Sequence, residues 1–318
     1  MLKRALGAAL LAAVPFATLA QSYPAKPVRI LVPHPPGGNT DAIARMLADK
    51  MKDRWNQPVV VENRPGAAGN IGAEAASKSP PDGHTLLMTV SGTLVINKTL
   101  FTKLAHDPDQ FVPVAVIAQV PLALTVGPKV SATSAQSLVE FAKANPGKLN
   151  NASGGTGSVG HLAAEFFKSS IGANIVHVPY NGIAPAITDL AGGQIDLLFV
   201  EPGLSLPHVK TGKLRILAVG TEKRNPQMAE VPTLGELIPG FAVADWFGMV
   251  APPGTPMPIA TAASAAVADA LKQPDVAKRL ADLNIDVVGS SPEEMGRRMA
   301  TERERWGKVI RAGNIKVE

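Results

Sequence analysis

Three glycine-rich turns are the segments of this chain whose residue types point to ligand binding. They are PPGGNTD at 35–41, NRPGAAGN at 63–70 and ASGGTGSVGH at 152–161. Each follows a predicted strand and precedes a predicted helix, whose first four N–H groups have no partner within the helix and carry partial positive charge. Glycine lets a ligand approach those groups without meeting a Cβ atom. The turns therefore predict a site for an anion, either a phosphate or a carboxylate.

The alternative for any one turn is a tight connection that binds nothing, and Gly37 and Gly38 would suit such a connection equally well. Three similar turns on alternating strand–helix units favour binding. The reason is that open α/β folds place their ligands beyond the carboxyl ends of the strands.

One turn also matches a cofactor motif. GTGSVG at 155–160 has the spacing of the dinucleotide fingerprint, but a lone match of this kind is weak evidence. The strand predicted after it, NIVHVPY, ends without the acidic residue that would hold a ribose. No Gly-Lys-Ser/Thr sequence occurs that could form a Walker-type phosphate loop. We therefore predict no cofactor.

Catalytic and metal-binding patterns are sparse. Ser158 lacks the glycine two residues earlier that the esterase elbow requires. No two of the six histidines stand at metal-ligand spacing on a predicted helix. His34 and His161 each lie beside a glycine-rich turn, where either could face a ligand or serve as a capping or hydrogen-bonding group. We predict no catalytic residue and no metal site.

The first twenty residues have the pattern of a secretory signal peptide, with the positive start MLKR, an apolar run and the possible cleavage sequence TLA. The chain has no cysteine, which excludes disulfides and thiolate metal sites. The net charge is +5, and removing Lys3 and Arg4 leaves +3, spread without basic runs. That pattern argues against nucleic acid as a partner. We expect a soluble periplasmic protein.

Apolar patterns predict alternating strands and helices. PVRILVP at 27–33 and QPVVVENR at 57–64 are typical of buried strands. Between them, an apolar stripe at four-residue spacing is typical of an amphipathic helix packed on a sheet. Three residues could cap the start of this helix: Asn39, Thr40 and Asp41. The alternation continues through the chain and predicts an α/β fold with mostly parallel strands.

Two segments predict the domain organisation. PLALTVGPKVSATSAQSLVEFAKANPG and DWFGMVAPPGTPMPIATAASAAVADALKQ share the order strand, proline, Ser/Thr-rich turn and long helix. If each strand carries the chain between two domains, residues 123–244 form an inserted second domain. The first domain then comprises residues 21–122 plus 245–318, after a signal peptide at 1–20.

Five stretches together resemble the extracytoplasmic solute receptors of tripartite tricarboxylate transporters, the Bug family. They are YPAKPVRILVPHPPGGNTDAIAR, VVVENRPGAAGNIGAEAASKSPPDGHTLL, NASGGTGSVGHLAAEFF, VPYNGIAPAITDLAGGQIDLLF and LAVGTEKRNPQMAEVPTLGE. The resemblance runs from about Tyr23 to the end of the chain. It implies a two-domain clamshell of the periplasmic-binding-protein type, type II-like, with two crossing strands. A small carboxylate would lie in the cleft, held by backbone amides and ordered water.

Carried over position by position, the resemblance implies a ligand site at the three turns and at the end of the strand LLMTV. Its residues are Pro36, Gly37, Gly38, Thr40, Asp41, Gly66, Ala67, Ala68, Ser91, Thr93, Ser153, Gly154, Thr156, Gly157 and His161. His34 and Glu201 complete the predicted site and depart from the family pattern. His34 stands where similar sequences carry Phe or Tyr, and Glu201 is an unusual acid at the end of the strand LLFVE. If Glu201 faces the cleft, it favours an amine or hydroxyl over a second carboxylate.

The resemblance implies a receptor that closes on its ligand and presents the closed shape to the membrane subunits of a transporter. The expected ligand is a di- or tricarboxylate, an amino acid or an aromatic acid, and the expected state is a monomer. Two alternatives stay open: a module that reports its ligand to a signalling kinase, and an exported hydrolase or lyase acting on a small acid. The missing triad and metal spacings argue against the enzyme.

Overall fold

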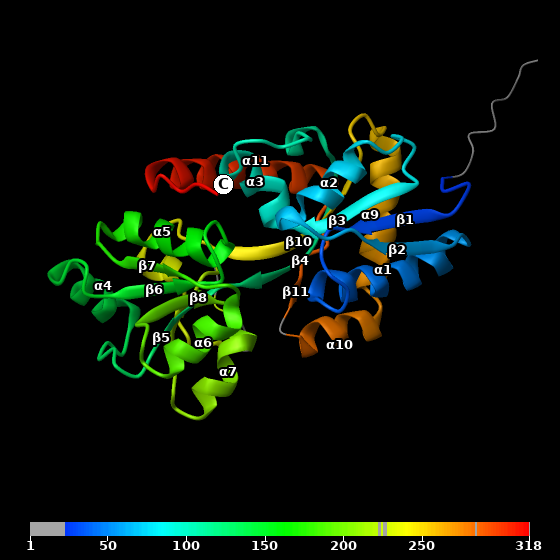
Figure 1. Cartoon of the computed structure of the whole chain (residues 1–318). Coiled ribbons are helices and arrows are strands. Elements are labelled where there is room, and N and C mark those ends of the chain that lie inside the picture. Colours follow the sequence, from blue (N-terminus) through cyan, green and yellow to red (C-terminus); the bar gives the residue numbers. More distant parts are fainter. Residues whose placement is uncertain (1–22, 222–223, 225–227, 284, 318) are drawn as a thin grey trace, which may run out of the picture.

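The computed structural model describes residues 23–317, apart from 222–223, 225–227 and 284. The expected signal peptide at 1–20 lies outside these residues. Two β-sheets, each flanked by helices, form two lobes that lie side by side (Figure 1). We call the lobe built on the six-stranded sheet the first lobe and the one built on the five-stranded sheet the second lobe.

The sheet of the first lobe carries the first two glycine-rich turns. Its strand order is β11-β4-β10-β3-β1-β2. β1 pairs in parallel with β2 and β3, whereas β10 runs antiparallel to β3 and β4. The bounds are Val28–Val32 for β1, Val59–Asn63 for β2, Thr85–Val90 for β3, Val112–Pro121 for β4, Ala244–Ala251 for β10 and Asp286–Val287 for β11.

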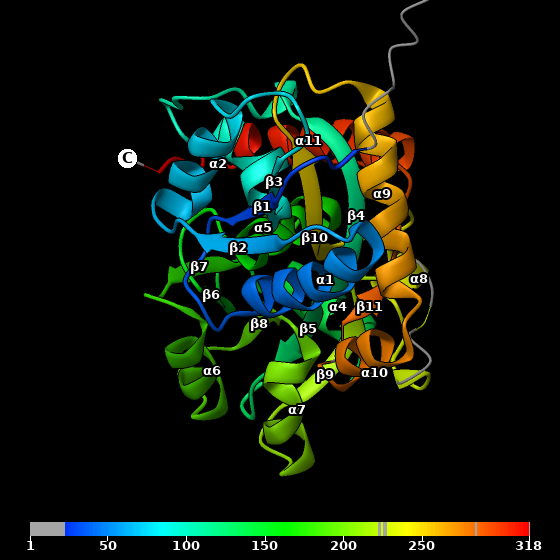
Figure 2. The same ribbon diagram turned by 90° about the vertical axis from the view of Figure 1, so that its right-hand side faces the viewer.

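Helices cover both faces of this sheet because neighbouring strand residues point in opposite directions. Ile30 packs with the helices α1, α9 and α10, and α1 lies beside α9 (Figure 2). The next residue, Leu31, packs with α2 and α11 on the other face. The bounds are Asn39–Trp55 (α1), Asn70–Ser77 (α2), Asn97–Leu100 (α3), Met257–Leu271 (α9), Pro274–Asp282 (α10) and Pro292–Ala312 (α11), with short turns at Ala67–Gly69 (η1), Gly92–Ile96 (η2) and Pro108–Gln110 (η3).

The sheet of the second lobe has the order β7-β6-β8-β5-β9. β6 pairs in parallel with β7 and β8, whereas β5 runs antiparallel to β8 and β9. The bounds are Ala123–Val126 (β5), Asn150–Ser153 (β6), Val176–Pro179 (β7), Leu197–Val200 (β8), Arg215–Val219 (β9), Ala135–Ala144 (α4), Val159–Ile171 (α5), Ile183–Ala191 (α6), Pro202–Lys210 (α7) and Leu234–Leu237 (α8). Each sheet thus combines parallel strands with an antiparallel strand that arrives from the other lobe, and the first sheet has a second antiparallel strand, β11, at its edge.

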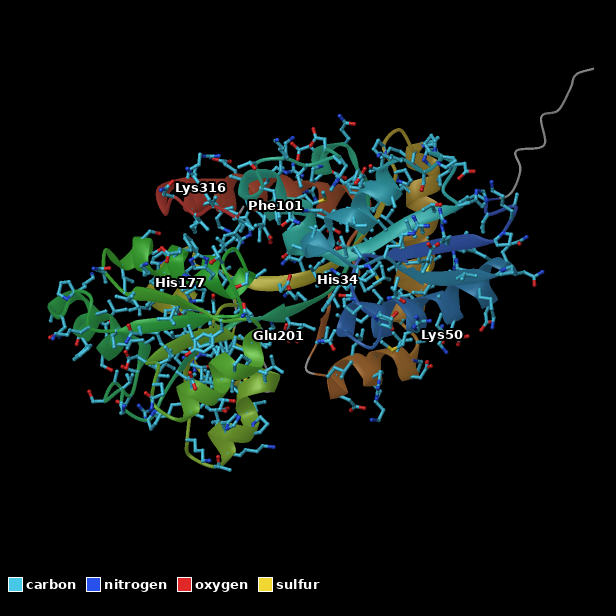
Figure 3. The ribbon with its side chains drawn as sticks, in the orientation of Figure 1. His34, Lys50, Phe101, His177, Glu201 and Lys316 are labelled. Carbon is cyan, nitrogen blue, oxygen red and sulfur yellow. The ribbon has the colours of Figure 1, made fainter. Side chains whose placement is uncertain are left out.

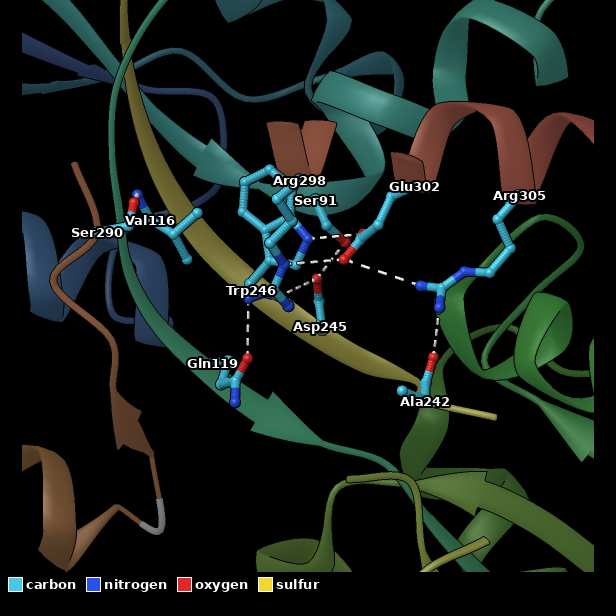
Figure 4. A network of polar contacts seen from close by, with 10 residues as sticks. All are labelled: Ser91, Val116, Gln119, Ala242, Asp245, Trp246, Ser290, Arg298, Glu302 and Arg305. Carbon is cyan, nitrogen blue, oxygen red and sulfur yellow. Dashed lines mark hydrogen bonds and ion pairs between the residues drawn. The ribbon is translucent and has the colours of Figure 1, made fainter. Parts of the chain in front are cut away.

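The chain passes between the lobes twice, through Leu122 after β4 and through Val243 before β10. Backbone hydrogen bonds tie the two passages together. Leu122 N donates to the Val243 carbonyl at 3.2 Å, and Gly220 N donates to the Leu122 carbonyl at 2.7 Å. α11 lies over this junction, where Trp246 Nε1 donates to the Glu302 carboxylate at 2.8 Å (Figure 4).

The predicted α/β fold is confirmed, and so is the apolar stripe of α1, since Ile43, Leu47 and Met51 are buried. The expectation of mostly parallel strands is confirmed, with three exceptions: β5 and β10, which enter from the other lobe, and the edge strand β11 run antiparallel to their neighbours. A strand that enters a sheet from the other lobe does not need the crossover helix that joins consecutive parallel strands. Its direction is therefore not fixed by the alternation of strands and helices.

Candidate functional site

Asp41 holds the turn that follows β1. Its carboxylate accepts hydrogen bonds from Gly37 N at 3.0 Å and from Asn63 Nδ2 at 2.9 Å. Arg45 pairs with the same carboxylate at 2.9 Å, and Asn63 also donates to the His34 carbonyl at 3.1 Å. Hydrogen bonding from Arg45 is the main cause that lowers the pKa of Asp41 to about 2. The Asp41 carboxylate is therefore used inside the protein, where it fixes the shape of the turn.

The start of α1 presents main-chain donors that no residue described by the structure uses. The N-cap is Gly38, and no side chain caps the helix. The prediction that Asn39, Thr40 or Asp41 caps the helix is therefore wrong. The Asp41 carboxylate accepts hydrogen bonds from Gly37 N and Arg45 instead. Among the described residues, no hydrogen bond uses the N–H groups of residues 38–40, and the backbone at 36–39 is exposed.

The turn that follows β2 has an unusual backbone. Gly66, Ala67 and Ala68 have φ angles of 130°, 47° and 53°, in a region that L side chains rarely adopt. The Ala68 carbonyl accepts hydrogen bonds from Asn97 Nδ2 at 3.1 Å and from Thr93 Oγ1 at 3.4 Å, which hold the turn against the end of β3. The three turn residues are exposed, and the N–H groups of Ala67 and Ala68 have no partner among the described residues.

The residues at the end of β3 connect these two turns to the second passage between the lobes. Thr89 Oγ1 donates to Thr93 Oγ1 at 3.0 Å and lies 3.4 Å from His34 Nε2. Ser91 Oγ donates to the Asp245 carboxylate at 2.7 Å. Ser91 and Thr93 are each 1% exposed, so their hydroxyl groups act within the protein. Burial lowers the pKa of His34, which favours its neutral ring.

Histidines hold the turn that follows β6. Gly157 N donates to His161 Nδ1 at 3.0 Å, and His161 Nε2 lies 3.7 Å from the Glu165 carboxylate. His177 stacks on His161 with 3.7 Å between the ring centroids, and its Nε2 lies 2.7 Å from Ser153 Oγ. Burial, followed by the neighbouring His161, lowers the pKa of His177 to about 4. Both ring nitrogens of His161 are therefore used within the second lobe.

This third turn also contacts the first lobe. A Cβ atom added to Gly157 would overlap Leu100 Cδ2 at the end of α3, so the turn and α3 pack closely. Gly154 is held by its carbonyl, which accepts a hydrogen bond from Gly182 N at 3.2 Å. Thr156 is exposed, and no hydrogen bond among the described residues uses its N–H group. The third turn, which carries predicted site residues, thus meets the first lobe at α3.

Glu201 stands between β8 and α7. It is the N-cap of α7, but its side chain caps nothing, and no hydrogen bond or ion pair among the described residues uses its carboxylate. Burial, followed by the negative charge of Asp245, raises the pKa of Glu201 to about 7. Figure 3 labels Glu201 and His34 in the region where the two lobes join.

The structure places the predicted residues at the carboxyl ends of β1, β2 and β3 in the first lobe and of β6 and β8 in the second. The exposed members are Pro36, Gly37, Gly38, Gly66, Ala67, Ala68 and Thr156. The partly buried members are His34, Gly154, Gly157 and Glu201. The buried members are Thr40, Asp41, Ser91, Thr93, Ser153 and His161. The exposed members of the predicted site thus offer main-chain groups, whereas the buried members have side chains that act within the protein.

Three further residues shape these turns and are not among the predicted ones: Asn63, His177 and Asp245. The sequence carries a signal only for Asn63, a polar residue at the end of an apolar strand and beside a glycine-rich turn. His177 reaches Ser153 across 24 residues, and Asp245 reaches Ser91 across 154 residues. No sequence pattern marks pairs at those separations.

A cavity of about 620 Å³ lies away from the three turns. β4, β10 and α11 contribute to its walls, which include Gln119, Arg298 and Glu302 but none of the predicted site residues. Arg298 donates to Gln119 Oε1 and to Glu302 Oε1, both at 2.9 Å, in the network of Figure 4. This cavity belongs to the junction of the lobes.

No group of three or more His, Cys, Asp or Glu side chains in the described part of the chain is arranged to hold a metal ion. Within the same residues, no helix has the length and apolar character needed to cross a membrane.

Comparisons with known proteins agree with one another. A family model described as "tripartite tricarboxylate transporter family receptor" matches residues 43–315. Protein BugT of Bordetella pertussis is 36% identical over 302 residues, which cover 94% of this chain and 93% of BugT.

Two ligand-bound structures resemble more than nine-tenths of this chain. An R. palustris protein with adipate is 36% identical, with a TM-score of 0.76, over 93% of this chain and 100% of that one. MatC from Rhodopseudomonas palustris with bound malate is 33% identical, with a TM-score of 0.72, over 91% of this chain and 100% of MatC. The predicted two-domain clamshell is therefore confirmed, and its relatives are binding receptors.

Proposed function

We propose that this chain, which belongs to the family of tripartite tricarboxylate transporter receptors, binds a small carboxylate between its two lobes and delivers it to a membrane transporter. One observation carries the proposal. The N–H groups of residues 38–40 have no partner among the described residues, although they lie at the positive end of the long helix α1. Such donors bind an anion, either a phosphate or a carboxylate. Adipate and malate, which relatives bind, are carboxylates, and they favour the second choice.

The proposed contacts are main-chain donors from both lobes. The first lobe supplies the N–H groups of residues 38–40 and of Ala67 and Ala68, and the second lobe supplies that of Thr156. The buried side chains of the predicted site act indirectly. Asp41 and His161 hold the turns, because each accepts a hydrogen bond from a turn glycine. No bond is broken in this mechanism, so no residue is assigned as a nucleophile or base.

The lobes correspond in this proposal to an inserted domain at 123–244 and a first domain at 21–122 plus 245–318. A ligand that contacts donors of both lobes stabilises the closed arrangement by its greater affinity for it. The membrane subunits of the transporter then bind the closed receptor, which acts as a monomer. Receptors of this family, such as BugD, are periplasmic, and the signal-like pattern at 1–20 supports the same location for this chain.

A thermal-shift screen tests the proposal. The panel contains mono-, di- and tricarboxylates, amino acids and aromatic acids, each beside its neutral amide. At a hundred times its dissociation constant a ligand stabilises the folded protein by about 2.7 kcal/mol. We expect at least one acid to raise Tm and its amide to leave it unchanged. If no acid in the panel raises Tm, the proposal is wrong.

A proline substitution tests the main-chain donors directly. Asn39 is the first residue of α1, and Gly38 before it is extended, with φ −79° and ψ 169°. Proline is favoured at the first position of a helix and after a residue with an extended backbone. At position 39 it removes the main-chain N–H group. We expect Asn39→Pro to weaken binding of the acid found in the screen by about tenfold or more, the equivalent of one charge-assisted hydrogen bond. Asn39→Ala keeps the N–H group and should bind normally; equal affinities would exclude this donor.

A further inference from the structure

Glu201 is a carboxylate without a partner at the junction of the lobes. It is partly buried at the carboxyl end of β8, the edge of the second sheet that also carries the turn after β6. Its side chain makes no hydrogen bond and no ion pair with any described residue. A carboxylate removed from water without compensation is costly, and proteins normally supply it with a cation or several donors.

A charged neighbour of Glu201 increases this cost. Asp245 lies within electrostatic range and raises the pKa of Glu201 in addition to the effect of burial. The Asp245 carboxylate is itself occupied, because Ser91 Oγ donates to it at 2.7 Å and Trp246 N donates to it at 2.9 Å. Asp245 therefore adds negative potential beside Glu201 and offers it no hydrogen bond.

The two ends of the proposed binding region differ in charge. Unused N–H groups at the start of α1 and in the turns suit a carboxylate. Glu201 and Asp245 disfavour a second carboxylate, because two like charges in a partly buried site repel each other strongly. A hydrogen-bond donor, above all a cationic amine, would instead satisfy the Glu201 carboxylate.

We propose that Glu201 determines specificity, and that the physiological ligand is a carboxylate that carries an amine, or more weakly a hydroxyl group, at the end that faces Glu201. The inference rests on the proposed function, since it assumes that the junction of the lobes holds a carboxylate ligand. It goes beyond that function because it selects amino and hydroxy acids from the broader class. An unbranched diacid such as adipate has no such donor and should bind poorly.

Isothermal titration calorimetry with two matched ligand series tests the inference. Succinate, malate and aspartate share two carboxylates and differ by a hydrogen atom, a hydroxyl group or an ammonium group at one carbon. Adipate and 6-aminohexanoate differ only in one end group. We expect the amine-bearing member of at least one series to bind about tenfold or more tightly than the plain diacid, the equivalent of one hydrogen bond to a charged group.

Two variants identify the residue responsible. Glu201→Gln keeps the size of the side chain and removes its charge, and we expect it to reduce the preference for the amine by about tenfold or more. Glu140→Gln removes the same charge from an exposed position on α4 of the same lobe and should leave the preference unchanged. Because burial disfavours the charged form of Glu201, Glu201→Gln should fold with an equal or higher Tm.

The outcomes separate this inference from the proposed function. If wild-type protein binds plain diacids as tightly as their amino analogues, or if Glu201→Gln keeps the wild-type preference, Glu201 does not set specificity, although a carboxylate receptor remains. If the wild-type protein binds no carboxylate in these series or in the wider screen, the proposed function fails, and the inference fails with it.

Discussion

The first and third glycine-rich turns are held by the same kind of hydrogen bond, from a glycine N–H group to a side chain, but the two acceptors differ. In the first turn, Gly37 N donates to the Asp41 carboxylate, and in the third, Gly157 N donates to His161 Nδ1. Both donors are glycines with positive φ, 87° and 79°, and both acceptors lie four residues later in the first turn of a helix. The two lobes thus shape their turns in the same way, but one uses a charged acceptor and the other a neutral ring.

The surroundings of the two acceptors explain this difference. Asp41 has a cationic neighbour, Arg45, which favours its charged form. His161 can accept a hydrogen bond only through an unprotonated ring nitrogen, and it stacks 3.7 Å from a second ring, His177. Two protonated rings at that separation would repel each other. The first turn should therefore resist acid better than the third, and it should depend more strongly on its anchoring side chain.

Removal of the charged acceptor should have the largest effect. Asp41→Ala deletes the acceptor for Gly37, Asn63 and Arg45, and we expect the free energy of unfolding to fall by about 2–3 kcal/mol. Because Arg45 is half exposed, water replaces part of its interaction and keeps the loss in this range. Urea denaturation at pH 7 measures the loss. Asp41→Asn retains one oxygen acceptor and should lose less.

The pH dependence of the same residue gives a second measurement. The pKa of Asp41 falls from its ordinary value of 3.8 to about 2 on folding. Its contribution to stability is therefore complete above pH 3.8 and is lost as the pH falls from 3.8 toward 2. Equal stability of Asp41→Ala and wild type at pH 7 would show that the first turn does not need its anchor.

The next largest effect concerns the glycines themselves. A Cβ atom at Gly37 would meet nothing within 4 Å, so Gly37→Ala should cost only the strain of positive φ, about 1–2 kcal/mol. Gly157→Ala has the same strain and must also displace Leu100 on the opposite lobe. We expect it to destabilise the protein by about 1 kcal/mol more than Gly37→Ala, measured by urea denaturation.

A double variant separates the two causes. In a Leu100→Ala background the added methyl group meets an open space, so the further cost of Gly157→Ala should fall to that of Gly37→Ala. If Gly157→Ala lowers the free energy of unfolding equally in the wild-type and Leu100→Ala backgrounds, the third turn does not pack against α3. The two lobes are then not in contact at this point.

Much of the fold can be read from local patterns. The strand VRILV, the stripe of α1 and the glycine-rich turns are local features, because each depends on residues a few positions apart. α7 is not predicted, since Pro207 interrupts its helical pattern. A strand is expected before the third turn, but the polar sequence NNAS of β6 does not give its bounds, which follow only from its pairing with β7 and β8.

The site shows the same limit. The positions of the turns follow from the sequence, because glycine and the helix start are adjacent in the chain. The acceptors that hold the turns, Asp41 and His161, are also local, at a separation of four residues. Two further partners, Asn63 beside Asp41 and His177 beside His161, come from neighbouring strands. Strand order decides which side chains become neighbours, and a single sequence does not give that order.

The smallest expected effect is a pH dependence confined to the third turn. The pKa of His177 falls from its ordinary value of 6.5 to about 4 on folding, because the ring is buried and faces His161, with Glu165 and Lys168 nearby. The unfolded chain therefore binds a proton that the folded protein does not. The contribution of the neutral ring to stability is complete above pH 6.5 and is lost as the pH falls from 6.5 toward 4.

Urea denaturation at pH 7.5 and 5.5 measures this contribution. Wild-type protein should lose about 1 kcal/mol between the two values through His177, after allowance for partial exposure of the ring. His177→Gln should remove that loss, whereas His208→Gln, a control on α7, should retain it. Asp41 titrates well below this range, and any contribution of His34, whose pKa burial also lowers, is the same in wild type and in both variants. If His177→Gln loses as much stability as wild type between pH 7.5 and 5.5, His177 does not make the third turn sensitive to mild acid. The turns held by Asp41 and by His161 then respond alike above pH 5.5.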